Sequence, residues 1–297
     1  MRERNAAPRE SKGCVTTLDY CIFFLMPLIA VRHIRKMRGG AQSHLLQADD
    51  GNSYVVKFRN NPQHRRILIN ELISSVLLDY LRISAPETAV LQVTPEFLAD
   101  NPEVHLTHGS RRLEVEPGWQ FASRYPGDPA RTAVYDFLPD ALLPSVVNLE
   151  DFRGILVFDQ WAGNADGRQT IFYRANVQVG RGAARPGFVA RMIDHGFVFD
   201  GPNWDFSDSP LQGLYPRRIV YDRVRSLDDF QPWLEQAMHF PEEVMDQAWK
   251  RIPPDWIAGE EPALELLLER LYERRKRLPE LLHACRGSRV DPFPNWK

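Results

Sequence analysis

The stretch Val55-Val56-Lys57-Phe58 decides the fold, because it places a lysine inside an otherwise apolar strand. A buried ammonium group is costly unless a carboxylate or an anion meets it. Glu71 follows early in a predicted helix, from which its side chain would reach back to the strand. A strand lysine held by a helix glutamate can present its charge to nucleotide phosphates. The alternative is a strand-edge lysine with its ammonium group in water.

Strands surround this stretch in the first half of the chain. Apolar residues at helical spacing predict one amphipathic helix over residues 69–80, which ends before Pro86. Residues 94–118 are polar and contain prolines, which is typical of a loop, and 126–129 form a predicted linker. The predicted strands are residues 28–35, 43–47, 52–58, 87–92 and 119–125, with a hairpin turn at 48–51.

The second half is predicted to be mixed and then helical. A helix over residues 148–161 is followed by strands at 170–174 and 188–193 around a glycine-rich connection. Helices dominate after residue 202, and leucines at helical spacing over 262–285 indicate a last helix packed on the core. The sequence therefore predicts an α+β protein.

A glycine turn between the first two predicted strands is a candidate phosphate site. Gly39 and Gly40 are followed by Gln42 and Ser43. Glycines without Cβ atoms let backbone N–H groups approach phosphate oxygens. Two adjacent glycines are also typical of an ordinary hairpin turn.

Two carboxylates in the second half are candidates for one magnesium–phosphate site. Asp166 and Asp194 each follow an apolar element and lie next to or near a glycine. Carboxylate oxygens suit a hard cation, so the pair predicts a magnesium–phosphate site in which one acid orients the acceptor hydroxyl. Asp159 and Asn164 are interpreted instead as caps of the preceding helix.

In this order, the motifs resemble those of the HipA-like kinase family, in particular its small, single-module bacterial branch. The resemblance covers about nine-tenths of the chain and implies a two-lobed protein-kinase-like fold, with an N-lobe antiparallel sheet plus one helix and a mainly helical C-lobe. It implies that Lys57 contacts ATP, Glu71 anchors Lys57, Asp166 is the catalytic aspartate and Asp194 binds Mg²⁺. The motifs are Gly39-Gly40, Val-Val-Lys57-Phe, Asn70-Glu71, Asp166-Gly-Arg168 and Ile-Asp194-His-Gly.

The chain departs from this family at one place. Related kinases have Asp-Gly-His-x-x-Asn, whose last residue is a second metal ligand, whereas Arg168 and Ile171 stand at the His and Asn positions here. Isoleucine cannot bind magnesium. Gln169 or Asn164 is the expected substitute, with Gln169 assigned to the metal.

These residues predict an ATP- and Mg²⁺-dependent phosphotransferase, acting on a Ser or Thr hydroxyl of an unknown protein or small-molecule acceptor. The alternatives are a catalytically impaired pseudokinase that acts as a nucleotide-dependent binding module, and a small-molecule kinase on the same fold. Ile171 favours the pseudokinase, and the retained Lys57, Glu71, Asp166 and Asp194 favour activity.

Composition limits the partners. Thirty-seven Lys and Arg against thirty-nine Asp and Glu give a formal charge of −2, without the basic excess of a dedicated nucleic-acid binder. Cys14, Cys21 and Cys285 form no C-x-x-C pair, which excludes a disulfide scaffold and fits the reducing cytoplasm. The larger HipA toxins carry an additional N-terminal subdomain that is not recognised here, so antitoxin and DNA partners are not implied.

The N-terminus differs from the rest. Basic residues precede an apolar run over residues 21–31, which is too short for a membrane-spanning helix of ~20 residues. We expect Met26 to be the native start, and no membrane partner. The expected domains are an extension over residues 1–25, an N-lobe over 26–125 and a C-lobe over 126–297.

Overall fold

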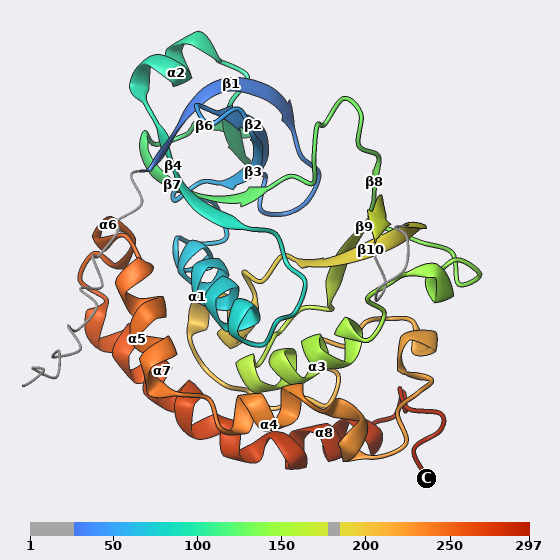
Figure 1. Ribbon diagram of the computed structural model, residues 1–297. Coiled ribbons are helices and arrows are strands. Elements are labelled where there is room, and N and C mark those ends of the chain that lie inside the picture. Colours follow the sequence, from blue (N-terminus) through green and yellow to red (C-terminus); the bar gives the residue numbers. More distant parts are fainter. Residues whose placement is uncertain (1–26, 178–184) are drawn as a thin grey trace, which may run out of the picture.

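The strands of the first half close into a barrel at one end of the molecule (Figure 1). They are seen in a computed structural model that describes residues 27–177 and 185–297. The predicted extension over residues 1–25 lies outside the described residues. The barrel strands, in chain order, are β1 (Leu28–Lys36), β2 (His44–Ala48), β3 (Ser53–Lys57), β4 (Thr88–Val93) and β7 (Gly118–Arg124).

Closure of the barrel corrects the prediction of a purely antiparallel sheet. The strand order is β1-β2-β3-β7-β4, and β4 returns to β1 through a short parallel pairing of Leu28 with Leu91 and Ile29 with Gln92. The other pairings are antiparallel. Closure satisfies the backbone groups that the edges of an open sheet leave unpaired.

Strand β3 occupies the position that the buried lysine requires. It pairs with β2 on one side and β7 on the other, with Lys57 opposite Phe121. Because side chains alternate along a strand, Val56 points into the barrel core while Lys57 points out of it. The lysine therefore faces the rest of the molecule from the outer face of the barrel.

The predicted loop over residues 94–118 contains secondary structure. Thr94 caps a short helix by accepting a hydrogen bond from the backbone N–H of Phe97 at 3.1 Å, and a hairpin follows. These elements are too short and too polar to show a clear hydrophobic period, so the loop prediction was wrong here. They are α2 (Pro95–Asp100), β5 (His105–His108) and β6 (Arg111–Glu114).

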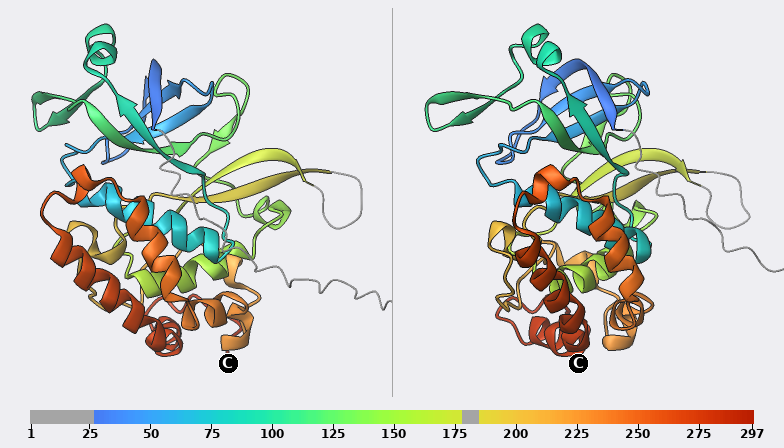
Figure 2. Two further views of the ribbon diagram at one scale, coloured as in Figure 1. Left: turned by 60° about the vertical axis from the view of Figure 1, so that its left-hand side comes forward. Right: turned by 90° about the vertical axis from the view of Figure 1, so that its left-hand side faces the viewer.

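The second half contains the predicted helix, the two predicted strands and the helices that follow them. A short strand that was not predicted, β8, pairs with β9 and makes the sheet three-stranded. The β9–β10 hairpin projects from between the barrel and the helices (Figure 2). The predicted last helix is divided into α7 and α8 by a 3-10 turn. The strands are β8 (Val134–Tyr135), β9 (Gln169–Val177) and β10 (Arg185–Ile193), and the α-helices are α3 (Asp151–Ala162), α4 (Trp233–Met238), α5 (Glu242–Arg251), α6 (Pro254–Ile257), α7 (Glu261–Arg274) and α8 (Leu278–Arg286).

Short 3-10 helices complete the second half, and none of the helices in the described ranges has the length and hydropathy needed to cross a membrane. The 3-10 helices are η1 (Leu143–Ser145), η2 (Val198–Asn203), η3 (Arg218–Tyr221), η4 (Leu227–Phe230) and η5 (Arg275–Arg277).

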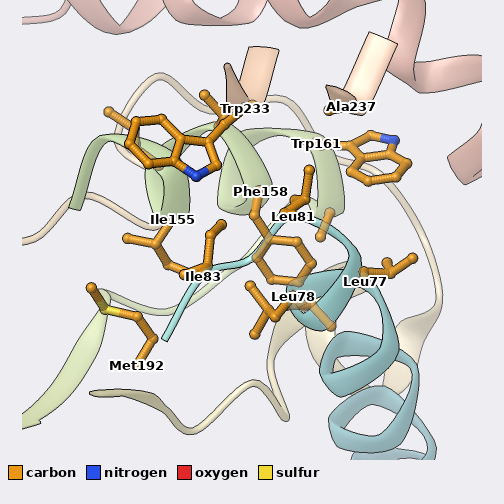
Figure 3. Close-up of a cluster of buried hydrophobic side chains, with 14 of the residues drawn as sticks. Leu77, Leu78, Leu81, Ile83, Ile155, Phe158, Trp161, Met192, Trp233 and Ala237 are labelled. Carbon is orange, nitrogen blue, oxygen red and sulfur yellow. The ribbon is translucent and has the colours of Figure 1, made fainter. Parts of the chain in front are cut away.

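Helix α1 (Arg66–Tyr80) links the two halves, because it belongs to the core of the helical part rather than to the barrel core. Leu77 and Leu78 lie beside Phe158 of α3 in Figure 3. Burial of one such apolar side chain contributes about 1.5–3 kcal/mol. The polar side of α1 is buried as well, with Asn70 and Glu71 at 0% and 4% exposure. The predicted amphipathic helix thus turns its polar side toward a site, not toward solvent.

Candidate active site

The ammonium group of Lys57 lies between two carboxylates. Lys57 is 7% exposed. Its Nζ donates to Glu71 on α1 and, at 2.6 Å, to Oδ1 of Asp194 just after β10. The predicted contact between Lys57 and Glu71 is therefore present. Asp194, more than a hundred residues further along the chain, is a second partner that the sequence did not indicate.

Burial and charge together set the ionisation of these groups. Burial disfavours the Lys57 ammonium, but the carboxylates of Glu71 and Asp194 outweigh it and raise the pKa of Lys57. Burial raises the pKa of Glu71, against the attraction of Lys57. For Asp194, burial is outweighed by Lys57 and Arg168, which hold its pKa below the ordinary value. Asp194 is therefore a stable anion, and its side chain is 31% exposed.

The Asn70-Glu71 pair on α1 holds the segment that follows Asp194. Oε1 of Glu71 accepts a hydrogen bond from the backbone N–H of His195 at 3.1 Å. Nδ2 of Asn70 donates to the Gly196 carbonyl at 2.7 Å, and Oδ1 of Asn70 accepts from the Trp204 indole at 2.8 Å. One helical dipeptide thus positions both the lysine and the aspartate segment.

The backbone at Asp194 has a left-handed conformation, with φ +59°. Two residues later, a Cβ at Gly196 would lie 2.5 Å from Cγ2 of Ile67, so only glycine allows this approach to α1. Gly196 is therefore required by the close contact between this segment and the helix.

Asp166 lies at the surface of a turn that follows α3. The helix ends at Gly163, whose φ of +59° is left-handed. Oδ1 of Asn164 accepts a hydrogen bond from the Asp166 backbone N–H at 3.1 Å, and the Asp166 side chain accepts one from Gln169 Nε2 at 3.2 Å. The Asp166 carboxylate is exposed and is oriented by its own turn.

Arg168 corrects the interpretation of Asp159 as a helix cap. Asp159 lies inside α3, and its buried carboxylate forms a bidentate ion pair with Arg168. Nε of Arg168 donates to Oδ2 at 2.8 Å, and Nη2 donates to Oδ1. A charge on the buried side of a helix requires a partner of this kind. Arg168 also donates to the Ile193 carbonyl at 2.8 Å, so it joins the Asp166 turn to the end of β10.

His195 is neutral within this network. Burial first, and then the charge of Arg168, place the pKa of His195 well below its ordinary value. Nη1 of Arg168 lies 3.2 Å from Nδ1 of His195, and Nε2 lies 3.2 Å from the Met192 carbonyl. These contacts assign the proton to Nε2, which donates to Met192, while Nδ1 accepts from the guanidinium group.

This buried neutral histidine predicts the pH dependence of stability. As pH falls past 6.5, the ordinary pKa, the unfolded chain binds a proton at His195 that the folded chain does not. The free energy of unfolding should therefore decrease as pH is lowered. Buried His44, whose pKa is lowered to about 4, adds to the same trend.

The measurement is the urea midpoint at several pH values across about pH 5 to 8, the range in which histidine titrates. His195→Gln should show a shallower pH dependence than the parent protein, whatever its stability at neutral pH. An unchanged dependence in this variant would contradict the assignment of a neutral His195.

Comparison with protein-family models identifies the family of this chain. The family model for HipA-like kinases matches residues 30–280. The chain belongs to the HipA-like kinase family. No curated protein sequence matches this HipA-like kinase. Family membership supports a phosphotransferase and agrees with the resemblance seen in the sequence.

Solved structures provide the fold of this HipA-like kinase. A crystal structure of the Golgi casein kinase is similar, with a TM-score of 0.50, 13% sequence identity, and coverage of 89% of this chain and 76% of that chain. A crystal structure of the Golgi casein kinase with Mn and ADP bound has a TM-score of 0.49, 13% identity, and coverage of 89% and 73%. The first comparison shows a protein-kinase-like fold.

Gln169 and Asn164, the two residues expected to replace the missing metal-binding asparagine, have different surroundings. Gln169 begins β9 beside Asp166, and it also helps to lower the pKa of Asp194. Asn164 is 1% exposed, and its amide is engaged by Asp159 and the Asp166 backbone, which removes it as a candidate metal ligand. Ile171 is half-buried further along β9, opposite Arg191. Of the two substitutes considered, only Gln169 lies with both carboxylates.

The glycine turn of this HipA-like kinase is attached to a neighbouring strand by one side chain. Gly39 has φ +119° and open space where a Cβ would be. The Gln42 amide, however, donates to the Thr107 carbonyl at 2.7 Å and accepts from the Thr107 backbone N–H at 2.7 Å. The Gln42 side chain therefore attaches the turn to β5, and the assignment of this turn to nucleotide binding, through its backbone N–H groups, stays a prediction. Ser43 is buried beside β2.

One buried contact of the site, the pairing of Asp159 with Arg168, could have been predicted from the sequence. Asp159 shares a helix side with apolar residues such as Phe152 and Ile155, and both of these are fully buried. A carboxylate on that side needs a cationic partner, and Arg168 is the nearest one downstream in the sequence. The pairing of Asp159 with Arg168 was thus accessible from helical spacing, whereas the contacts of Asn70 were not.

Proposed function

We propose that this chain is an ATP- and Mg²⁺-dependent phosphotransferase that acts on a hydroxyl group, such as that of Ser or Thr, in an acceptor still to be identified. The observation that supports it most is the Lys57 ammonium held jointly by Glu71 and Asp194. The arrangement places a cation that can contact nucleotide phosphates next to an anion that can bind a metal ion.

The donor set fits magnesium. Asp194 and Gln169 offer oxygen ligands, and the Gln169 side chain is exposed. In residues 27–177 and 185–297, no group of three or more His, Cys, Asp or Glu side chains forms a dedicated metal cage. Mg²⁺ usually retains water and takes one or two carboxylates plus substrate phosphates. When bound, the ion would neutralise charge on the phosphates.

The protein groups then have separate roles in transfer. Lys57 would contact the phosphates, and Glu71 would keep its ammonium group in place. Asp166 would accept a hydrogen bond from the acceptor hydroxyl and take its proton as the oxygen attacks the γ-phosphorus. The bond between that phosphorus and the β,γ-bridging oxygen breaks, and ADP leaves with the bond electrons. Catalysis of this kind rests on position and electrostatics.

The decisive experiment measures ATP binding with and without Mg²⁺, and then transfer of labelled phosphate to the protein itself or to a lysate. Lys57→Ala should weaken ATP binding. Glu71→Gln should reduce transfer more than binding, because it changes lysine placement and retains the cation. If Lys57→Ala binds ATP as well as the parent protein, Lys57 does not contact the nucleotide.

Substitution of Gln169 tests the metal site itself. Gln169→Ala should raise the Mg²⁺ concentration for half-maximal ATP binding by roughly tenfold, by analogy with loss of a supporting ligand. Asp194→Asn should abolish the Mg²⁺ effect. Ile171→Asn should not restore Mg²⁺ affinity in the Gln169→Ala background, because Ile171 lies further along β9, opposite Arg191. Asn176→Ala, an exposed amide on the same strand, is the matched control and should change nothing.

The outcomes are distinct. If only Asp194→Asn matters, one protein carboxylate with phosphates and water suffices for the metal. If Asp194→Asn is silent, the magnesium assignment is wrong. If ATP and Mg²⁺ bind but no phosphate is transferred to any acceptor, the protein is a pseudokinase, the alternative that Ile171 favours.

A further inference from the structure

Helix α7 contains a buried arginine, Arg274, that the proposed function does not use. It is 5% exposed, and all three nitrogen atoms of its guanidinium group donate hydrogen bonds. Nε donates to the Trp161 carbonyl at 2.9 Å, and Nη2 donates to the Gln160 carbonyl at 3.1 Å. Nη1 forms an ion pair with Oδ1 of Asp208 at 2.5 Å. Because the guanidinium fork is planar and rigid, Arg274 holds two segments of the chain at once.

The first of these segments is the last turn of α3. The last four carbonyls of an α-helix have no partner within the helix, and a cation beside them interacts favourably with the helix dipole. Arg274 provides both the donors and the charge. The Trp161 indole adds a second link, since it donates to the Leu271 carbonyl of α7 at 2.8 Å. The helix ends at Ala162, so α7 fixes the point from which the Asp166 turn starts.

The second segment is residues 205–214, which follow η2. Asp208 attaches this segment to α7. Further along, the Gln212 side chain donates to the Ser207 carbonyl at 2.5 Å, and the Gln212 carbonyl accepts from the Gln160 side chain of α3 at 2.8 Å. The 205–214 segment is therefore bound to α7 and to α3 and is also closed on itself.

The end of the 205–214 segment contacts the Asp166 turn through the backbone. The Gly213 N–H donates to the Asp166 carbonyl at 3.3 Å, and the Leu214 carbonyl accepts from the Arg168 N–H at 3.4 Å. The turn is thus attached to α3 by the chain and to the 205–214 segment by these two hydrogen bonds. Arg274 contacts both of these attachments.

We propose that Arg274 is a positioning residue for Asp166, which it keeps in place through the end of α3 and the 205–214 segment. This inference rests on the proposed function, in which Asp166 takes the proton of the acceptor hydroxyl. The Asp166 carboxylate is exposed, so its position depends on the backbone of its turn. A displacement of only 1 Å can reduce the rate of a positioned group by about 10²-fold.

Hydrogen exchange of the full chain, measured by mass spectrometry of its peptides, tests the contact without any acceptor. Asp208→Asn removes the ion pairs with Arg274 and Arg277 and replaces a side chain that is 40% exposed, so we expect it to fold. Amides in residues 163–168 and 205–214 should exchange roughly tenfold faster, because charged hydrogen bonds are lost. Amides of α1 should exchange as in the parent protein. Unchanged exchange in residues 163–168 would overturn the proposal.

Transfer of labelled phosphate tests the positioning role. Arg274→Lys retains the charge but cannot form all three hydrogen bonds, so the rate at saturating ATP should fall roughly 10–100-fold at an unchanged ATP dissociation constant. Asp208→Asn should show the same pattern. Glu273→Gln, which replaces an exposed carboxylate on the same helix, is the matched control and should leave the rate unchanged. An ATP affinity that falls as much as the rate would overturn the proposal.

A double variant decides whether Arg274 acts through Asp166. In the Asp166→Asn background, Arg274→Lys should reduce the rate by less than about threefold, because the carboxylate that it positions is already absent. A further loss of 10–100-fold in this background would overturn the proposal and leave Arg274 with a structural role only. A parent protein that transfers no phosphate would contradict the proposed function, and the exchange result alone would then decide whether Arg274 holds the Asp166 turn.

Discussion

Replacing Arg168 by methionine is expected to lower the free energy of unfolding by about 3–5 kcal/mol, because it leaves the buried carboxylate of Asp159 without its cation. Both side chains are completely buried. The backbone at Gly213 also packs closely on Asp159, since a Cβ there would lie 2.0 Å from Cβ of Asp159. The measurement is the urea midpoint at neutral pH.

A double variant separates loss of charge pairing from loss of packing. Asp159→Asn with Arg168→Gln removes both charges but retains hydrogen-bonding groups, so it should recover at least half of the lost stability. Arg131→Met breaks an exposed pair with Asp128, whose side chains are 87% and 55% exposed, and is the matched control. It should cost less than about 1 kcal/mol. If Arg168→Met costs no more than Arg131→Met, the buried pair does not stabilise the fold.

Replacing Asp166 by asparagine is expected to reduce phosphoryl transfer by about 10²–10⁴-fold, the usual contribution of a positioned general base. This result rests on the proposed function. The Asp166 side chain is exposed, and it accepts hydrogen bonds from the Gly167 backbone N–H and from Gln169. Fold stability and nucleotide binding should therefore change little. The measurement is the rate of labelled phosphate transfer at saturating ATP.

The control for this experiment is Asp136→Asn, which removes an exposed carboxylate from another loop and should leave the rate unchanged. Transfer by Asp166→Asn at the parental rate, with Asp194→Asn inactive, would show that a different group aligns the acceptor. Loss of ATP binding in Asp166→Asn would show that Asp166 acts on the nucleotide and not on the acceptor.

A few buried residues that stabilise the fold also position the segment that contains Asp194. Arg168 touches the carbonyl of Ile193 and the ring of His195, so it fixes the residues on both sides of Asp194. Glu71 and Asn70 hold the same segment from α1. The metal-binding candidate is therefore positioned from opposite directions by a buried ion pair and a buried helix face, which favours a preformed site.

Several features of this site were accessible from the sequence. A lysine in an apolar strand needs a partner because burial of a lone charge is costly, and Glu71 was in reach from the next helix. Hydrophobic periodicity likewise predicted α3, β9 and β10, because those elements are long enough to repeat their pattern. The short elements between β4 and β7 were missed since they have no such repeat.

What the sequence by itself determined was the local chemistry: which strand contains the buried cation, and which helix supplies its carboxylate. These follow from short-range periodicity and from the cost of burying charge. Only the tertiary structure decided that the Gln42 side chain hydrogen-bonds to Thr107 and that Asp159 pairs with Arg168. It also decided that Gln169, and not Ile171, lies beside the carboxylates. Those contacts depend on strand register and on the packing of distant segments, and a single-residue shift along β9 would turn Gln169 to the other face.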